Sequence, residues 1–164
     1  MEERENRTQA FANFFRAHYE AITRSVYGIV RNAETAKDVA QDAFIQVDKH
    51  WAKVSRYDRP DLWVRRVAIR LAVKNVRRQA LGDKLIRRLA QSPRSDPSTD
   101  LDLDEALSEL SPMQRAAVVL YYYEGFDTTD LGHILDCSAA TVRVHLNRAR
   151  NKLRAVLGEA SIEL

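Results

Sequence analysis

The sequence predicts an all-α protein made of two small helical domains joined by a flexible linker. Apolar residues recur at helical spacing over most of the chain, and the alternation typical of β-strands is absent. Only 5 of the 164 residues are glycine and 4 are proline. The segment QSPRSDPSTDLDLD differs, because it has two prolines, many Ser, Thr and Asp residues and no apolar period. We therefore expect domains at 1–90 and 102–164, with a linker at 91–101.

The first domain is expected to be a bundle of three or four helices. The first helix should run from about Gln9 to Val30, and the second from an Asn32 cap to about Trp51. A loop, KVSRYDRPD, precedes a third helix that Pro60 opens and that reaches at least Arg78. The expected buried residues are Phe11, Phe15, Tyr19, Ile22, Val26 and Ile29 on the first helix, and Ala36, Val39, Ala43, Phe44 and Val47 on the second.

The second domain begins near Leu101 and carries clear signals for helix starts. Ser111, Pro112 and Gln114 form the pattern of a capping box with proline at the first helical position. We expect that helix to end at Gly125. Asp127 should cap the next helix, and Ser138 should cap the last.

The last two helices are short and have the pattern of a helix-turn-helix, in which the second helix enters the major groove of DNA. Gly132 allows a close helix crossing, and Asp136 tolerates the left-handed backbone that the turn needs. The apolar stripe of the last helix is Val142, Leu146, Ala149 and Leu153. Its opposite face presents Ala140, Arg143, Val144, Asn147, Arg148 and Asn151.

The charge pattern favours polyanionic partners at two separate places. The net charge of +3 conceals a nearly all-basic block from 65 to 88, an acidic block from 96 to 109, and a basic block from 143 to 154. On the third helix, one strip consists of Arg66, Arg70, Lys74 and Arg77, and no acidic residue on that helix after Asp61 neutralises it. Tyr57, in the preceding loop, is a candidate for an exposed contact with unstacked bases, whereas Trp63 is expected in the core.

The outward face of the second helix is acidic with an apolar centre, which suits a protein partner with a basic rim. Its residues are Asp38, Gln41, Asp42, Ile45 and Asp48. A solvated face with one stray isoleucine explains the same pattern equally well.

No constellation for catalysis, cofactor binding or metal binding stands out. Cys137 lies four residues from His133 and near His145, but a fourth zinc ligand is lacking, so Cys137 is expected to be a small core residue. A single cysteine, a polar N-terminus and no apolar run of roughly 20 residues predict a cytoplasmic protein.

Three stretches together resemble a bacterial group IV (extracytoplasmic-function, ECF) RNA polymerase sigma factor of the sigma-70 family. DVAQDAFIQV is similar to the core-binding part of sigma region two, and LWVRRVAIRLAVKNVRR to its promoter-melting and −10-reading helix. The residues from Leu110 to Leu157 are similar to sigma region four, and the whole resemblance extends from about Phe11 to Leu157.

The resemblance implies a factor that lends promoter specificity to RNA polymerase and is not itself an enzyme. It implies binding to the clamp of the largest polymerase subunit and the flap of the second largest, and in many members to an anti-sigma factor. The implied clamp contacts are Asp38, Gln41, Asp42, Ile45 and Asp48. The implied −10 contacts are Tyr57, Arg66, Arg70, Lys74 and Arg77. The implied −35 contacts are Ala140, Thr141, Arg143, Val144, Asn147 and Arg148.

Two other classes of protein share some of these features. A response-regulator-like or repressor transcription factor has the same helix-turn-helix, but it predicts an upstream sensor domain, and the first domain has no such pattern. A helical adaptor that binds only proteins leaves the two basic faces unexplained. A stoichiometric complex with core RNA polymerase distinguishes the sigma factor from both.

Overall fold

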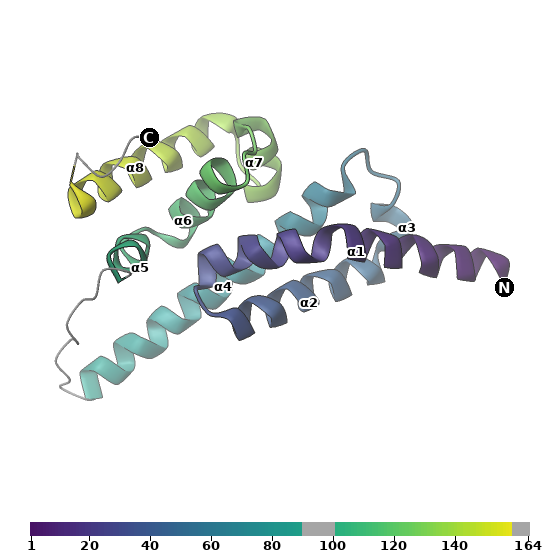
Figure 1. Cartoon of the computed structure of the whole chain (residues 1–164), viewed down its shortest axis with the longest axis horizontal. Helices are drawn as coiled ribbons and strands as arrows, with labels where there is room; N and C mark the ends of the chain where they lie inside the picture. Colours follow the sequence, from purple (N-terminus) through teal and green to yellow (C-terminus); the bar gives the residue numbers. More distant parts are fainter. Residues whose placement is uncertain (90–100, 159–164) are drawn as a thin grey trace.

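Figure 1 shows the computed structural model of the protein, which describes residues 1–89 and 101–158. Within these ranges every regular element is helical, which confirms the predicted fold class. The first half contains α1 (Glu2–Val30), α2 (Ala33–Lys49), α3 (Trp51–Val54) and α4 (Pro60–Leu89). The second half contains α5 (Leu101–Ser108), α6 (Pro112–Val118), the π-helical turn η1 (Val119–Tyr123), α7 (Thr128–Leu135) and α8 (Ala139–Leu157). The predicted linker at 91–101 lies, except for Leu101, outside the described residues.

Two helix boundaries in the first half differ from the prediction. α1 begins at Glu2 instead of near Gln9. Acidic side chains in its first turn stabilise the positive end of the helix. The prediction missed this segment because it contains no apolar residues at helical spacing. α2 ends at Lys49, and the chain turns at His50 into the short α3. This turn allows both Trp51 and Val54, at either end of α3, to be buried. The start of the predicted loop is therefore helical.

The predicted caps are present. Asn32 Oδ1 accepts a hydrogen bond from the Thr35 amide at 2.9 Å. Ser111 and Gln114 form the reciprocal capping box, with distances of 3.2 and 3.1 Å. Local side-chain chemistry thus determines where these helices begin.

The helix that starts at Pro112 does not continue regularly to Gly125. From Val119 to Tyr123 the backbone widens into a π-helical turn, and Gly125 then takes a φ of 76°, which favours glycine. Val119, the first residue of this turn, lies against Gly28 of α1, where an added Cβ would lie 2.9 and 3.0 Å from the two Val119 methyl carbons. Only a glycine allows α1 to approach this closely.

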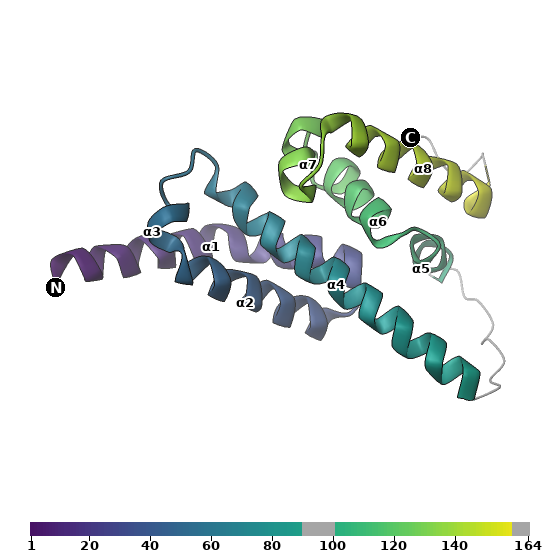
Figure 2. The ribbon, with the colours of Figure 1, turned by 180° about the vertical axis from the view of Figure 1, so that it is seen from behind.

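The two halves share one hydrophobic core, and α4 lies between them. α2 packs on one side of α1 and α4, and α6 and α7 pack on the other side (Figures 1 and 2). Buried residues of α1, α2, α4, α6, α7 and α8 form one continuous cluster, which includes Ile22 of α1 and Leu146 of α8. A smaller cluster joins α5 to the far part of α8. The halves are therefore packed against each other.

A buried arginine connects three helices across this packing. Arg115 on α6 is 8% exposed, and its Nε donates to the Leu107 carbonyl at 2.9 Å. Its Nη1 donates to the Ile29 carbonyl at 2.7 Å, at the carboxyl end of α1. Burial, together with the charge of Arg31, lowers the pKa of Arg115. The guanidinium thus supplies a hydrogen bond to a carbonyl in the last turn of α1, and it shares the Leu107 carbonyl with the Leu110 amide.

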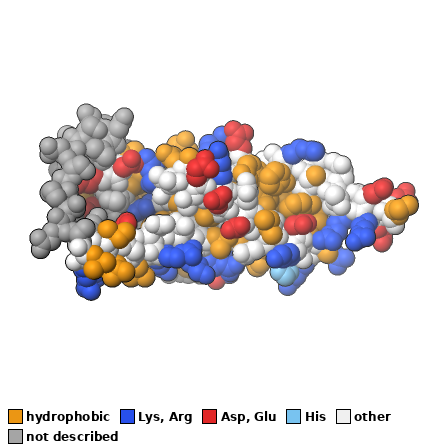
Figure 3. All heavy atoms as spheres, turned by 90° about the horizontal axis from the view of Figure 1, so that it is seen from below, with side chains coloured by type: hydrophobic (Ala, Val, Ile, Leu, Met, Phe, Trp, Pro, Cys, Tyr) orange, Lys and Arg blue, Asp and Glu red, His pale blue; other side chains and the backbone are white. Residues whose placement is uncertain are grey.

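The far end of α4 extends beyond α1 and α2 (Figure 1). Figure 3 shows apolar side chains gathered at this end of the molecule. The exposed apolar residues there are Leu81, Leu85, Ile86 and Leu89. This end of α4 takes no part in the shared core.

Phe44→Ala should lower the free energy of unfolding by about 3–5 kcal/mol, because it removes a buried ring from the centre of the first half. Phe44 is 2% exposed and packs edge-on against Phe15 at 4.9 Å between ring centroids. Urea denaturation followed by circular dichroism measures the change. The adjacent Ile45→Ala, on the exposed side of α2, should change it by less than about 0.5 kcal/mol. Equal losses in both variants would contradict the placement of Phe44.

Candidate nucleic-acid and protein interfaces

The turn between α7 and α8 has the tight geometry of a helix-turn-helix. Asp136 takes the left-handed conformation that the sequence predicted, with a φ of 55°. A Cβ at Gly132 would lie 2.7 Å from the Cys137 carbonyl oxygen. The glycine is therefore required by the turn that follows α7, and not by a helix crossing as the sequence suggested.

The last helix, α8, buries the side that was predicted to be buried. Val142, Leu146, Ala149 and Leu153 are each 5% exposed or less. Ser138 caps the helix by accepting from the Thr141 amide at 3.1 Å. The predicted −35 residues all lie on the exposed surface of the first turns of α8: Ala140, Thr141, Arg143, Val144, Asn147 and Arg148. Their assignment to DNA remains a prediction.

Between the two faces of α8 lies His145, which is half-buried. Burial and the nearby charge of Arg148 both lower the pKa of His145. Both effects favour the neutral form of the imidazole, beside the proposed DNA-binding face. Arg150, one turn further, donates a hydrogen bond to the Tyr122 hydroxyl and so ties α8 to η1.

The basic strip of α4 lines one wall of a groove of about 420 Å³. Arg66, Arg70, Lys74 and Arg77 all border this groove, as their spacing predicted, and the opposite wall comes from α6 and α7. After Asp61, the sequence of α4 contains one acidic residue, Asp83, which lies beyond the strip. Arg66 is paired from outside the helix: its Nη2 lies 2.6 Å from a carboxylate oxygen of Asp136, in the helix-turn-helix turn.

The loop before α4 forms a second hollow, of about 440 Å³. Tyr57 and Trp63 lie with ring centroids 5.5 Å apart, and Arg66 covers the Trp63 ring at 5.3 Å. Both aromatic residues are half-buried, so Tyr57 is less exposed and Trp63 less buried than the sequence suggested. Asp130 and His133 of α7 complete the lining.

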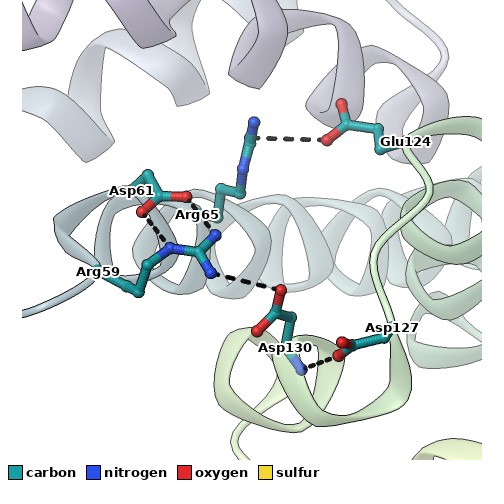
Figure 4. Close-up of polar contacts among 6 residues, drawn as sticks. All are labelled: Arg59, Asp61, Arg65, Glu124, Asp127 and Asp130. Atoms are coloured by element: carbon teal, nitrogen blue, oxygen red, sulfur yellow. Dashed lines mark hydrogen bonds and ion pairs between the residues drawn. The ribbon is translucent and has the colours of Figure 1, made fainter.

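Arg59 connects this loop to both halves of the chain (Figure 4). Its guanidinium donates to both carboxylate oxygens of Asp61, at 3.0 and 2.9 Å, and lies 3.6 Å from Asp130 of α7. The hydrogen bonds and charge of Asp61 raise the pKa of Arg59. Burial opposes ionisation of Asp61, but the hydrogen bonds and charge of Arg59 outweigh it, so the pKa of Asp61 is lowered.

Sequence reasoning missed Arg65, which is 8% exposed. Its guanidinium lies 3.6 Å from Glu124 (Figure 4). It also covers the Phe126 ring at 4.9 Å. Glu124 also accepts a hydrogen bond from Ser25 of α1. In the sequence Arg65 is one of many basic residues, and nothing local indicates that a carboxylate from the second half will cover it.

The acidic face of α2 points away from the core, as expected. The proposed polymerase contacts, Asp38, Gln41, Asp42, Ile45 and Asp48, are all exposed. Ile45 has 54% of its surface accessible at the centre of this face. The described residues include no ion pair that involves Asp38, Asp42 or Asp48, so these carboxylates can meet a basic partner. Their assignment to the polymerase clamp remains a prediction.

Cys137 is half-buried against the shared core. Burial and the charge of Asp136 raise the pKa of its thiol. Over residues 1–89 and 101–158, the structure contains no group of His, Cys, Asp and Glu residues that could hold a metal ion. No helix among those described is long and apolar enough to cross a membrane.

Comparison with known proteins accounts for both halves of the chain. Residues 14–81 match Sigma-70 region 2, and residues 100–153 match Sigma-70, region 4. The ECF RNA polymerase sigma factor SigM of Mycobacterium tuberculosis is 30% identical over 158 residues, which cover 91% of this chain and 78% of SigM. The chain belongs to the ECF sigma factors of bacterial RNA polymerase. Because the match extends over both halves, neither the sensor-linked regulator nor the protein-only adaptor applies.

Two further relatives agree with this family. The RNA polymerase sigma factor CarQ of Myxococcus xanthus is 29% identical over 168 residues, which cover 98% of this sigma factor and 97% of CarQ. The sigma factor RpoE of Bartonella quintana, solved in complex with the anti-sigma factor NepR, has the same fold. Its TM-score is 0.67 at 23% identity, covering 92% of this chain and 98% of RpoE.

Acid should destabilise the protein through two histidines. Burial lowers the pKa of both His145 and His18. At His18 the charge of Asp61 raises the pKa and the charge of Arg65 lowers it, but burial is the largest effect. A pKa lowered by folding gives stability that is complete above the unfolded value of about 6.5 and is lost as the pH falls below it. His145→Gln should therefore reduce the decrease in unfolding free energy between pH 7.5 and 5, measured by urea denaturation, and adding His18→Gln should reduce it further. An unchanged decrease in the double variant would refute this origin.

Proposed function

We propose that this sigma factor directs promoter-specific transcription through three separate surfaces, one for each of its contacts. Region four denotes here residues 100–153, and region two denotes residues 14–81. The exposed basic face of α8 carries the proposal, because it combines small residues at its start with arginines further along and has no acidic residue. Run-off transcription with core RNA polymerase and genomic promoter fragments tests it.

The face of α8 is proposed to read the −35 element. Ala140 lies at the start of the helix, where a small side chain allows close approach to the major groove. Arginine donates two hydrogen bonds to guanine and also neutralises phosphates, so Arg143 and Arg148 suit either contact. Asn147 suits adenine, and Val144, which is 45% exposed, suits a thymine methyl group.

Region two is proposed to hold the −10 element along α4. Single-stranded DNA is bound where a basic groove follows the backbone and aromatic rings stack on bases. The groove of Arg66, Arg70, Lys74 and Arg77 supplies the charge, and the adjoining hollow beside Tyr57 supplies the ring. The hollow is proposed to take an unstacked base, because a ring and two arginines, Arg59 and Arg66, border it.

The face of α2 around Ile45 is proposed to bind the clamp of the polymerase largest subunit, and region four to bind the flap of the second largest. An apolar centre within a ring of carboxylates fits a basic surface with an apolar pocket. We further propose a domain division at 1–90, 91–101 and 102–164, in line with the separate family matches at 14–81 and 100–153. A cytoplasmic location, an anti-sigma partner and the lack of a catalytic role are proposed for this chain from its membership of the sigma factor family.

Arg148→Ala should weaken binding to duplex promoter DNA and reduce the salt dependence of that binding. Loss of one phosphate contact lowers the slope of log K against log salt by about 0.9. Fluorescence anisotropy with the polymerase holoenzyme between 50 and 200 mM salt measures the slope. Arg4→Ala, at the opposite end of the molecule, removes the same charge and should leave the slope unchanged. Equal slopes for Arg148→Ala and wild type would exclude the phosphate contact.

Asp42→Arg should abolish association with core RNA polymerase, because it places a like charge against the basic partner surface. Size-exclusion chromatography of the mixed proteins measures complex formation, and circular dichroism checks the fold. Asp83→Arg makes the same reversal at an exposed position of α4 outside the proposed interface and should leave association intact. A normal complex with Asp42→Arg would refute the clamp assignment.

A further inference from the structure

We infer that the end of α4 is a docking surface for a membrane that contains anionic lipids. The α4 tip denotes here residues 78–89, which follow the proposed −10 strip on the same helix. The tip presents exposed apolar side chains together with basic ones. A surface that binds both kinds of group must offer hydrocarbon and negative charge side by side, which an anionic bilayer does.

The α4 tip exposes apolar side chains that the core of the protein does not use. Val76 packs against the shared core. Beyond it, Leu81, Leu85 and Leu89 are 70%, 60% and 81% exposed. These leucines recur every four residues, so they form one stripe along the helix, and Ile86, which is 62% exposed, widens it. Single exposed leucines are common, but four large aliphatic side chains so close together form a patch that favours an interaction.

The side of the α4 tip next to the leucines is basic. Lys84 and Arg88 are exposed and lie one turn apart, in line with Arg77 of the basic strip. The sequence of the tip contains four basic residues and one acidic residue, Asp83, so its net charge is +3. None of the ion pairs within the described part of the chain involves Lys84 or Arg88, so both can meet an external anion.

The arrangement of the helices in the first half leaves the α4 tip uncovered by its neighbours. Figures 1 and 2 both show α4 running past α1 and α2 to one end of the molecule. Figure 3 shows apolar side chains gathered at this end, with basic side chains beside them. A bilayer can therefore meet the last turns of α4 before it meets α1 or α2.

The apolar and basic residues of the tip suit different depths of a bilayer. Leucine side chains leave water when they enter the boundary between headgroups and acyl chains. Long Lys and Arg side chains lay their stems along apolar surface and keep their charged ends among the headgroups. Arg78, which is exposed at the start of the leucine stripe, can do the same. Binding should therefore need lipid charge and apolar contact together, and salt should weaken it.

Other partners fit only part of this pattern. Nucleic acid neutralises basic residues, but aliphatic side chains do not stack on its bases as aromatic rings do. A second copy of the chain brings the same basic residues face to face, and the tip has far fewer side chains than the roughly 20–30 residues a side of a stable interface. An acidic amphipathic helix of another protein is the competing occupant. Vesicles free of other proteins distinguish it from lipid.

The first test is co-sedimentation of the full-length free protein with lipid vesicles. We expect binding to vesicles of equal parts phosphatidylglycerol and phosphatidylcholine, and little binding to phosphatidylcholine alone. Lys84→Gln with Arg88→Gln should weaken binding to the mixed vesicles about 25-fold, because each basic residue at an anionic surface contributes about fivefold. No binding of the unsubstituted protein to the mixed vesicles, or equal binding to both kinds, would overturn the inference.

Leu85→Gln tests the apolar stripe in the same assay, and Ile45→Gln is its matched control. Each change removes an aliphatic side chain of the same size from a helix surface, with 60% of Leu85 and 54% of Ile45 accessible. Leu85→Gln should weaken binding to the mixed vesicles about tenfold or more, and Ile45→Gln should leave it unchanged. Circular dichroism checks that both variants fold. Equal binding of the two variants would show that the leucine stripe is not the contact and would overturn the inference.

An environment-sensitive nitrobenzoxadiazole label shows which part of the protein meets the lipid. The label is placed on Leu89→Cys at the tip or on Ala10→Cys, which is exposed on α1, in a Cys137→Ser background. Emission from Leu89→Cys should shift to shorter wavelength when the mixed vesicles are added, and emission from Ala10→Cys should not. A shift at Ala10→Cys alone, or at neither position, would overturn the inference. Neither promoter DNA nor polymerase takes part, so these outcomes are independent of the proposed function.

Discussion

The packing of α4 on two sides is the constraint on which the rest of the structure depends. Val64, Ala68 and Ala72 of this helix have no accessible surface, because α1 and α2 cover one side and α6 and α7 cover the other. Without the first contact region two has no core, and without the second the helix-turn-helix loses its support. The basic strip lies at the border of the second contact. Its position therefore depends on how region four is placed.

Close approach at two glycines makes that placement specific. Gly28 lets η1 reach the backbone of α1, and Gly132 lets the turn before α8 fold back on α7. Val119 still has α-helical backbone angles and its amide bonds to the Arg115 carbonyl, so the direction of α6 points this side chain at Gly28. Arg115 then satisfies the end of α1 from the other half. The apolar contact of Val119 with Gly28 and the hydrogen bond from Arg115 to Ile29 therefore lie on the same interface between the two halves.

The arrangement divides the functional surfaces into exposed and engaged ones. The α2 face around Ile45 and the α8 face around Arg148 have no partner within the described part of the chain. Arg59 and Arg66, beside the proposed −10 surface, are paired with carboxylates of α7 and of the turn that follows it. Basic residues on both proposed DNA surfaces suit phosphate, but only these two are paired with acidic groups of region four.

Local chemistry made much of this protein predictable. The caps at Asn32, Ser111, Asp127 and Ser138 depend on side chains within three residues of the amides they bind, and helical periodicity alone separates the buried stripe of α8 from its exposed face. The resemblance of short motifs indicated the family. Tertiary structure alone decided the ion pairs of Arg59 with Asp130, of Arg65 with Glu124 and of Arg66 with Asp136. These pairs join residues distant in the chain, and such contacts leave no periodic signal in the sequence.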